Sequence, residues 1–223
     1  MGTDDLIARL LGIEVSALCD ADKTLPVVDP DVRAMVADVR MAGRALPVLA
    51  DGDHLPVFSA LAEAQRGDVL VIAAGGAGAG VAVLGELFAT EARRRGVAGV
   101  VIDGRCRDVH GLRRVGLPVF ARGTTPRSGT TVARPPLGEP LRCGGVDVDR
   151  GDVVFGDDDG VVIAPPERMA AALETGEAIG RAERAMLAAM ADGRPLHDLT
   201  SWAEHVARLD RGEDSRLEFR VDA

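Results

Sequence analysis

The sequence predicts an α/β protein, and three observations carry this prediction. Two apolar runs, DVLVIAA at 68–74 and VAGVVID at 97–103, are typical of buried strands, with a helical pattern between them. The hydrophobic share is 47% but the aromatic share only 3%, so the core must consist mainly of Ala, Val and Leu. The stretch GGVDVDRGDVVFGDDDGVVIAPP at 144–166 reads as short strands joined by the turns DRGD and DDDG, which favours hairpins.

The N-terminal part is expected to alternate helices and a strand. An amphipathic helix is predicted near residues 4–11, where Leu and Ile recur on one face. A second helix is predicted over 29–43, with Asp29 as N-cap, Pro30 at the first helical position and Gly43 past the end. A strand should follow at 44–50, and a helix around 57–65.

The remaining elements follow from similar signals. The glycine loop GGAGAG at 75–80 matches a dinucleotide-binding pattern poorly and more naturally lets the backbone turn tightly beside a ligand. The next helix begins near Glu86 and closes at Gly96, with three arginines in its last turn. A strand at 118–122, a loop at 124–140 and a helix over 166–191 complete a single domain, 1–200. The tail, 201–223, is expected on the surface or against a neighbouring subunit.

Composition argues against several classes of protein. Three widely separated cysteines with no C-x-x-C spacing do not suggest a disulfide framework or a zinc site. The opening residues do not have the form of a signal peptide, and no run of about 18 apolar residues predicts a membrane span. We therefore expect a cytoplasmic protein that does not contact a membrane.

Charge is distributed unevenly along the chain. The formal net charge is −9, yet residues 93–142 contain eleven arginines and only three acids. A basic centre within an acidic protein favours a small anionic ligand. Nucleic acid is not the expected partner, because only one aromatic residue, Phe120, lies within this region for base stacking.

The spacing between Glu86 and the pair Arg107-Asp108 predicts a common site. In a strand–helix–strand unit, the helix N-terminus and the carboxyl ends of both strands lie on one edge of the sheet. A helix of about ten residues rises roughly 15 Å, and a five-residue strand returns about 16 Å. Taken singly, Glu86 could be a favourable acid in a first helical turn, and Arg107-Asp108 a surface ion pair. Together they predict a pocket.

This pocket has the chemistry to bind an anion and a metal ion. The first-turn N–H groups of Glu86, Leu87 and Phe88 suit a carboxylate or phosphate. Arg107 offers a bidentate partner for an oxyanion. Asp108 and Glu86 are hard oxygen donors suited to Mg²⁺ or Mn²⁺. An anion site, a metal and an arginine at one place would stabilise an enolate.

The sequence around this site resembles a known family. The run GELFATEARRRGVAGVVIDGRCRD, followed by GLPVFARG, the hairpin stretch and the late Glu183, is similar to the RraA-like proteins over roughly residues 14–200. These include the class II 4-hydroxy-4-methyl-2-oxoglutarate/4-carboxy-4-hydroxy-2-oxoadipate aldolases and the regulators of ribonuclease activity A. The resemblance implies a three-layer β/β/α swivelling-domain fold, assembled as a homotrimer or hexamer with active sites at subunit interfaces.

The resemblance also implies roles for individual residues. Asp108 would bind the divalent metal, and Arg107 would contact the oxygens of the pyruvyl group. Glu86 would act through a water molecule on the metal, and the amides of Leu87 and Phe88, after Gly85, would hold the substrate carboxylate. Glu183 would reach the metal from the neighbouring subunit, although Glu174 and Glu177 lie on the same predicted helix. The implied reaction is retro-aldol cleavage of a 4-hydroxy-2-oxo dicarboxylate to pyruvate, with oxaloacetate decarboxylation through the same enolate.

Two departures from the family pattern and four further points complete the predictions from the sequence. Glu86 stands where Asp is common, and Gly111 occupies a position that is usually acidic in the aldolases. His110 is a further candidate for lining the site, and DDDG at 157–160 favours a hairpin turn over a metal loop. A non-catalytic protein that regulates a ribonuclease or another partner is the alternative function. An S-adenosylmethionine methyltransferase is disfavoured by the β-rich half after residue 143.

Overall fold

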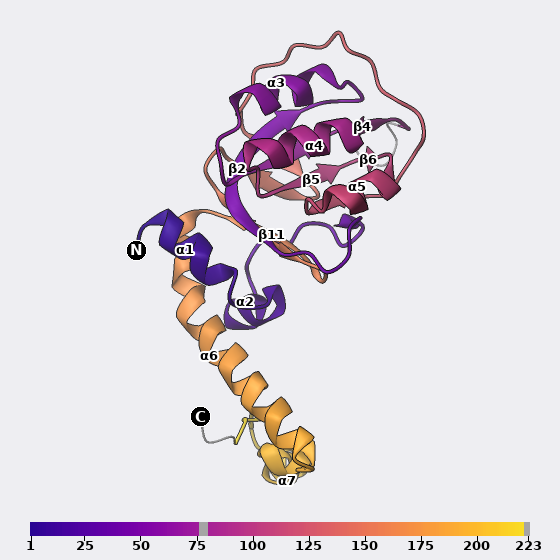
Figure 1. Cartoon of the computed structure of the whole chain (residues 1–223). Helices are drawn as coiled ribbons and strands as arrows, with labels where there is room; N and C mark the ends of the chain where they lie inside the picture. The colour runs from indigo at the N-terminus through magenta and orange to yellow at the C-terminus, as the bar shows by residue number, and fades with distance from the viewer. Residues whose placement is uncertain (76–79, 221–223) are drawn as a thin grey trace.

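A seven-stranded mixed sheet organises the protein, which we describe from a computed structural model covering residues 1–75 and 80–220 (Figure 1). The strand order is β1-β7-β5-β3-β2-β10-β11. The central pairs β2–β3, β3–β5 and β5–β7 are parallel, while β1, β10 and β11 pair antiparallel at the two edges. The strands of this sheet are β1 Arg33–Ala34, β2 Met41–Leu49, β3 Asp68–Ala73, β5 Gly99–Asp103, β7 Val119–Ala121, β10 Val153–Asp157 and β11 Gly160–Ala164.

Two short strand pairs and the helices complete the fold. The pair β4 (Ala82–Leu84) and β6 (Arg105–Cys106) is parallel, and β8 (Leu141–Cys143) and β9 (Val146–Val148) form a hairpin. The helices are α1 Thr3–Leu10, α2 Val15–Ala21, α3 Leu55–Glu63, α4 Glu86–Arg95, α5 Val109–Val115, α6 Pro166–Ala191 and α7 Trp202–Asp210, with a 3₁₀ helix at Leu196–Leu199. Among the described residues, no helix combines the length and apolar character that crossing a lipid bilayer requires.

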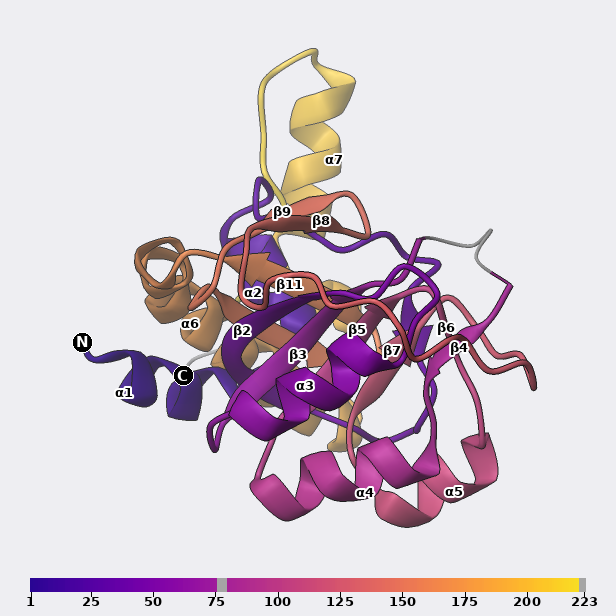
Figure 2. The same ribbon diagram turned by 90° about the horizontal axis from the view of Figure 1, so that it is seen from above.

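Alternating side chains of the parallel strands build two cores on opposite faces of the sheet. On one face, Leu46, Leu70 and Val100 pack under α3, α4 and α5. On the other, Val69 and Val101 pack against the β8–β9 hairpin, which lies across the sheet from these helices (Figure 2). Successive side chains of a strand point to opposite faces, so both faces of these parallel strands are buried. The protein thus has the β/β/α layering and the α/β class expected from its sequence.

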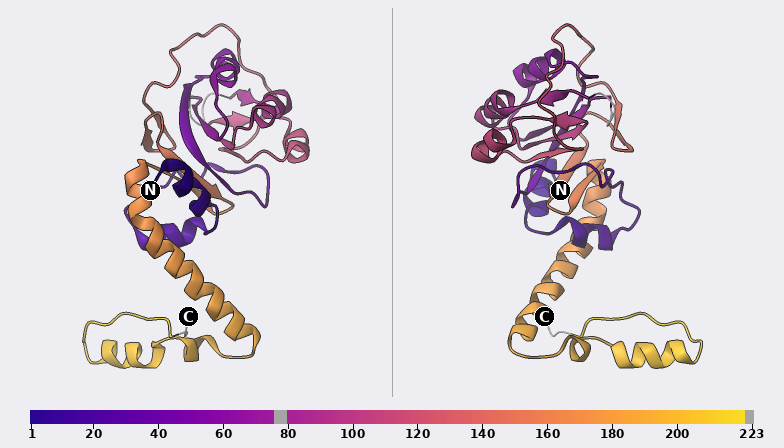
Figure 3. Two further views of the ribbon diagram at one scale, coloured as in Figure 1. Left: turned by 60° about the vertical axis from the view of Figure 1, so that its left-hand side comes forward. Right: turned by 90° about the vertical axis from the view of Figure 1, so that its right-hand side faces the viewer.

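A third cluster attaches the N- and C-terminal helices to the β10–β11 end of the sheet. Leu6 and Leu10 of α1, Leu18 of α2 and Leu173 of α6 pack with Phe155 of β10. Beyond this contact, the 26-residue helix α6 leaves the body, and α7 lies at its far end (Figures 1 and 3). We call residues 181–220 the C-terminal arm. None of the residues of α7 is buried.

The predicted helix over residues 29–43 is wrong. This segment contains only the two-residue strand β1, several bends and the start of β2. Its backbone is held by distant strands, because Asp29 N–H donates to Gly144 O and Met35 N–H to Val119 O, each at 2.8 Å. Gly43 is not a helix cap but part of β2, where a Cβ would lie 2.2 Å from the carbonyl oxygen of Gly67. Tertiary pairing therefore overrides the local helical signals.

Most other predicted elements are confirmed. The helix expected over 166–191 has these bounds as α6, and the turn at 157–160 joins the paired strands β10 and β11. The turn DRGD at 149–152 joins strands of two different sheets, so it does not close a hairpin. Helix α5 and the short strands β4 and β6 were not predicted. Residues 76–79 of the glycine loop lie outside the described residues.

Candidate functional site

The start of α4 and the segment after β6 meet at one edge of the sheet, as the lengths of the helix and the returning strand between them predict. The short strands β4 and β6, which precede α4 and Arg107 respectively, pair in parallel. The backbone N–H of Arg107 donates to Leu84 O at 2.9 Å. The N–H of Glu86 donates to Oδ2 of Asp108 at 3.3 Å. The structure therefore brings Glu86, Arg107 and Asp108 to one place through backbone pairing.

Gly85 permits this close approach. It is the N-cap of α4, and its side of the helix faces the Arg107-Asp108 pair directly. A Cβ at position 85 would lie 2.5 Å from Oδ2 of Asp108 and 3.0 Å from Cγ of Arg107. Any side chain here would displace the carboxylate or the guanidinium. The geometry of the site therefore requires glycine at position 85.

Asp108 has an unusual backbone. Its φ of 58° and ψ of 39° place it in the left-handed region, which non-glycine residues rarely adopt. It precedes α5, and its side chain makes no capping hydrogen bond to that helix. The carboxylate is directed instead toward α4 and remains 47% exposed. Such conformations cluster at functional sites, where the surrounding structure maintains them.

A cavity of about 240 Å³ opens at this place. It is lined by residues from four segments of the chain, which are His54, Gly85, Leu87, Phe88, Arg107, Asp108, Ser128 and Thr131. Five of the predicted site residues thus share one cavity, namely Gly85, Leu87, Phe88, Arg107 and Asp108. The first-turn N–H groups of α4 have no acceptor within their own helix, so those of Leu87 and Phe88 are suited to an anion.

Arg107 lines this cavity, and one of its donors lies buried behind the lining. Its Nε is buried, and among the described residues it has no hydrogen-bond partner. The nearest carboxylate oxygen, Oδ2 of Asp108, is 3.5 Å away, which makes an ion pair but not a hydrogen bond. A buried donor without an acceptor is costly. The side chain as a whole is 35% exposed, so a ligand oxygen would meet the exposed part of the guanidinium.

The side chain of Glu86 turns away from this cavity. Its Oε1 forms an ion pair with Arg114 of α5 at 2.8 Å. Its Cδ and Oε2 occupy the space beside Gly111, where a Cβ would lie 2.4 Å from both atoms. The departures at positions 86 and 111 are therefore linked in space, since the longer acid occupies room that the glycine leaves free.

Three residues that line the cavity were not predicted from the sequence, namely His54, Ser128 and Thr131. His54, just before α3, and Ser128, in the loop after β7, are 74 positions apart, yet His54 Nε2 lies 2.6 Å from Ser128 Oγ. Asp53 anchors this loop. Its Oδ2 accepts hydrogen bonds from the Thr130 hydroxyl at 2.6 Å and from Val132 N–H at 2.8 Å. Burial would raise the pKa of Asp53, but these bonds outweigh it and hold the pKa below its ordinary value.

Comparisons with known proteins agree with this fold and site. A family model described as RraA-like, Aldolase/RraA, matches residues 15–163, about two thirds of the chain. The protein belongs to the RraA-like family. A Halalkalibacterium halodurans relative named "Putative 4-hydroxy-4-methyl-2-oxoglutarate aldolase" is 33% identical over 162 residues, which are 72% of this chain and 77% of the relative.

Solved structures give the same fold. The RNA-processing inhibitor RraA from Thermus thermophilis aligns with a TM-score of 0.63 and 29% identity, over 68% of this chain and 92% of that one. An uncharacterized protein from Pseudomonas syringae aligns with a TM-score of 0.75 over 87% of this chain and 96% of that one. At 23% identity this second likeness concerns the fold alone. The RraA-like family includes proteins named as aldolases and proteins named as inhibitors. Membership of the family therefore does not by itself assign an activity to this chain.

Two further residues that the sequence suggested for the site, His110 and Glu183, do not line the cavity of their own chain. His110 is exposed on α5 and does not line it. Glu183 lies on the C-terminal arm, in a shallow pocket with apolar side chains that include Met186, Leu187 and Phe219. Of the other acids on α6, Glu177 is bound to Arg9 of α1, with a shortest contact of 2.7 Å. Glu183 could reach Asp108 only from another subunit.

The residues present fit a divalent metal only with help from a ligand. Among the described residues, no group of three or more His, Cys, Asp or Glu side chains could hold a metal ion. Asp108 offers one exposed carboxylate at the cavity. Mg²⁺ is commonly held by one or two carboxylates, with substrate oxygens and water completing the octahedron. The donor set is consistent with Mg²⁺ or Mn²⁺ bound together with an oxygen-rich substrate.

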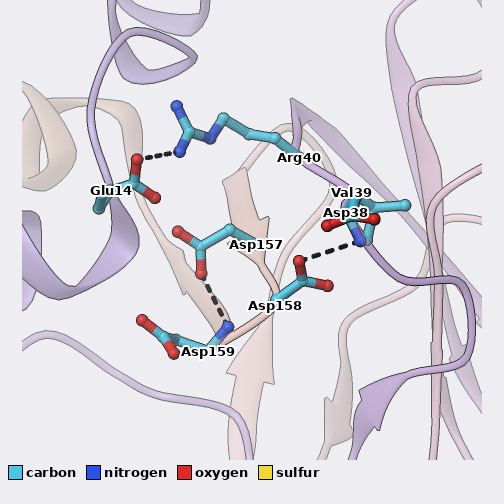
Figure 4. Close-up of a pocket in the computed structure, with 7 residues that line it drawn as sticks. All are labelled: Glu14, Asp38, Val39, Arg40, Asp157, Asp158 and Asp159. Atoms are coloured by element: carbon cyan, nitrogen blue, oxygen red, sulfur yellow. Dashed lines mark hydrogen bonds and ion pairs between the residues drawn. The ribbon is translucent and has the colours of Figure 1, made fainter.

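A second, larger cavity of about 430 Å³ has the wrong charge for an anionic ligand. Figure 4 shows its lining, with Glu14 paired to Arg40 and three consecutive aspartates, 157–159, at the β10–β11 turn. Burial raises the pKa of Asp157, which accepts hydrogen bonds from Val15 N–H at 2.8 Å and Asp159 N–H at 3.0 Å. These contacts satisfy the turn internally, as expected for a structural hairpin.

Proposed function

We propose that this protein is a divalent-metal-dependent lyase that cleaves a 4-hydroxy-2-oxo dicarboxylate, of the 4-hydroxy-4-methyl-2-oxoglutarate type, to release pyruvate. Oxaloacetate decarboxylation would use the same enolate. The observation that carries the proposal is the meeting of the Arg107 guanidinium, the Asp108 carboxylate and the α4 N-terminus at one cavity. The relative named as an aldolase supports the reaction class.

The chain's own residues would bind and polarise the keto acid. The amides of Leu87 and Phe88, with Gly85 leaving room beside them, would hold the substrate carboxylate at the positive end of α4. The guanidinium of Arg107 would donate to the keto oxygen and stabilise the negative charge that develops there. Removal of one such donor from an enzyme commonly lowers kcat by about 10²–10³-fold.

Asp108 would hold the metal. A role for Glu86 through a water molecule on the metal would require its side chain to leave Arg114 and turn into the cavity. The Glu86 N–H already fixes the Asp108 carboxylate from the α4 side. A bound Mg²⁺ or Mn²⁺ would supply Lewis-acid stabilisation of the enolate charge. The small anionic substrate matches the basic region around this edge of the sheet, residues 93–142, better than nucleic acid does.

We further propose that the protein assembles as a homotrimer or hexamer in which Glu183 reaches the site of a neighbouring subunit. Leu87, which lines the cavity, and Phe58, which stacks on Phe88, are 81% and 60% exposed, which is costly for a monomer. Light scattering should show a trimer or hexamer. At a metal concentration that limits Asp108→Asn, this variant and Glu183→Gln should each be impaired, and mixing their subunits should restore part of the activity if both residues serve one shared site. Full activity of Glu183→Gln by itself would show that Glu183 is dispensable.

A pyruvate-release assay tests the central proposal. Purified protein should release pyruvate from a 4-hydroxy-2-oxo dicarboxylate and from oxaloacetate with Mg²⁺ or Mn²⁺, and should lose this activity in EDTA. Arg107→Ala should reduce turnover at least about 10²-fold, whereas Asp108→Asn should chiefly raise the metal concentration required. Arg113→Ala, an exposed arginine of the same region, is the matched control. Pyruvate release no faster than the uncatalysed rate from either substrate would refute the lyase.

A non-catalytic regulator is the second candidate function. The solved RraA, described as an RNA-processing inhibitor, favours it, as do the exposed apolar residues of the C-terminal arm, such as Leu187 and Trp202. It predicts inhibition of a ribonuclease or another partner that survives the double substitution Arg107→Ala/Asp108→Asn. The lyase proposal predicts that this double variant loses all pyruvate release.

A further inference from the structure

The His54 ring is fixed on all sides in the wall of the cavity. Its exposed fraction is only 8%, and Nδ1 lies 3.3 Å from Val83 O. At the other end, Nε2 lies 2.6 Å from Ser128 Oγ and accepts the Gly129 N–H at 2.9 Å. Phe88 packs edge-on against the ring at a centroid distance of 5.8 Å.

These contacts determine which nitrogen of His54 carries the proton. A backbone N–H can only donate, so the Gly129 amide requires an unprotonated Nε2. The proton of the neutral ring then lies on Nδ1, facing the carbonyl of Val83. Nε2 is therefore a base, and the Ser128 hydroxyl, which also lines the cavity, lies within hydrogen-bond reach of it.

We propose that Ser128 and His54 form the proton relay for carbon–carbon bond cleavage, an inference that rests on the proposed lyase function. As the C3–C4 bond of the substrate breaks, its electron pair becomes part of the pyruvate enolate. The O–H electrons at C4 form the new carbonyl, and that proton passes to Ser128 Oγ while the proton of Ser128 passes to His54 Nε2. The proton on His54 then leaves through Ser128 to solvent, and a solvent proton adds at C3, which yields pyruvate and restores the pair.

The position of Glu86 supports this assignment. Its carboxylate pairs with Arg114 at 2.8 Å and fills the space beside Gly111, outside the cavity lining. Ser128 and His54 line the same cavity as Arg107 and Asp108. A proton acceptor within hydrogen-bond reach of the reacting hydroxyl must lie in that lining. In this chain the relay fits that requirement better than the acid at position 86.

Oxaloacetate provides an internal control, because its decarboxylation has no hydroxyl proton to remove. Loss of CO₂ produces the enolate directly, still stabilised by Arg107. A defect in the relay should therefore slow aldol cleavage and spare decarboxylation. A defect in binding or folding should slow both reactions together, which separates the two explanations.

The experiment compares both reactions in the full-length protein with Mg²⁺. Ser128→Ala and His54→Gln should lower kcat for aldol cleavage by about 100-fold, the usual contribution of general acid–base catalysis. KM for both substrates and kcat for oxaloacetate should change little, and Ser128→Thr, which retains a hydroxyl, should recover much of the lost rate. Glu86→Gln should reduce aldol cleavage less than His54→Gln does. His110→Gln, on the exposed face of α5, is the matched histidine control.

Nitrogen-15 NMR of the imidazole gives a readout that does not depend on activity. It should show His54 protonated at Nδ1, and a proton found on Nε2 would overturn the relay. Equal losses in both reactions would also overturn it and leave the pair a role only in holding the loop. Unchanged aldol cleavage in both variants would do the same. Absence of both activities in the unsubstituted protein would instead refute the lyase itself, a result distinct from a selective failure of the relay.

Discussion

The backbone N–H of Glu86 donates to Oδ2 of Asp108 at 3.3 Å, which joins the first turn of α4 to the residue that precedes α5. Through this one contact the helix N-terminus and the carboxylate are held in a fixed relation. The contact depends on the absence of a side chain at Gly85, where a Cβ would lie 2.5 Å from the same oxygen.

Gly85→Ala should therefore disrupt the site while leaving the fold intact. The added methyl group must displace the Asp108 carboxylate or the Arg107 side chain, because both lie within 3.0 Å of its position. We expect metal affinity and pyruvate release to fall by at least about 10-fold, with a modest decrease in Tm. Calorimetric titration with Mn²⁺ and the pyruvate assay measure this effect. Gly2→Ala, whose Cβ meets no atom within 4 Å, should behave as the unsubstituted protein.

Gly129→Ala should detach the loop that carries Ser128. A Cβ at position 129 would lie 2.1 Å from the carbonyl oxygen of Gly52, a backbone atom that cannot move independently. The expected loss is about 1–3 kcal/mol of unfolding free energy, as for other overpacked sites. Aldol cleavage should also decrease, since the Gly129 N–H no longer orients His54. Urea unfolding with unchanged stability would contradict this account of the loop.

Arg122→Ala should destabilise the edge of the sheet. Arg122, whose side chain is only 15% exposed, bridges Asp103 of β5 and Asp29. Its removal leaves the Asp103 carboxylate, 18% exposed, without its cationic partner. We expect a loss of about 2–4 kcal/mol, below the upper range for a fully buried pair because Asp29 is more exposed. The companion variant Asp103→Asn/Arg122→Ala should recover part of this stability in denaturant titrations.

The buried thiols should make the protein sensitive to alkali. Burial raises the pKa of Cys106 from 9.0 to about 11 and that of Cys143 from 9.0 to about 12. Above pH 9 the unfolded chain ionises these thiols while the folded protein keeps them neutral. Stability is therefore lost as pH rises from 9 toward 11 or 12, by about 1.4 kcal/mol per pH unit for each thiol.

Unfolding midpoints measured between pH 8 and 11 test this expectation. Cys143→Ala should flatten the decline above pH 9, although it loses some packing at every pH. Native protein should also resist alkylation of Cys106 and Cys143 at pH 8, because thiolate is the reactive species. Rapid modification of either residue without unfolding would contradict the burial seen in the structure.

The sequence predicts the parts of the fold that repeat a simple pattern. The spacing of Glu86 and Arg107-Asp108 follows from one helix and one strand, so the meeting of these segments could be derived in advance. The bounds of α6 followed from Pro166 and a continuous helical composition. In each case the interactions that decide the structure lie within about 25 residues of one another.

The rest depends on contacts between distant segments. Asp29, Pro30 and Gly43 give the signals of a helix, but hydrogen bonds to Gly144 and Val119 hold that segment extended. The His54–Ser128 pair depends on the path of an irregular loop. Its one local signal is Gly129, whose closeness to Gly52 becomes evident only in three dimensions. The direction of the Glu86 side chain likewise follows from Gly111 and Arg114, not from the motif.

The left-handed backbone at Asp108 implies a cost in folding stability at a residue whose carboxylate lines the cavity. A glycine there would adopt φ of 58° without steric cost, and Asp108→Gly would be expected to tolerate heat at least as well as the native chain. It would do so without the carboxylate that completes the cavity. A search for thermostable variants guided by backbone geometry alone would therefore favour the loss of this carboxylate.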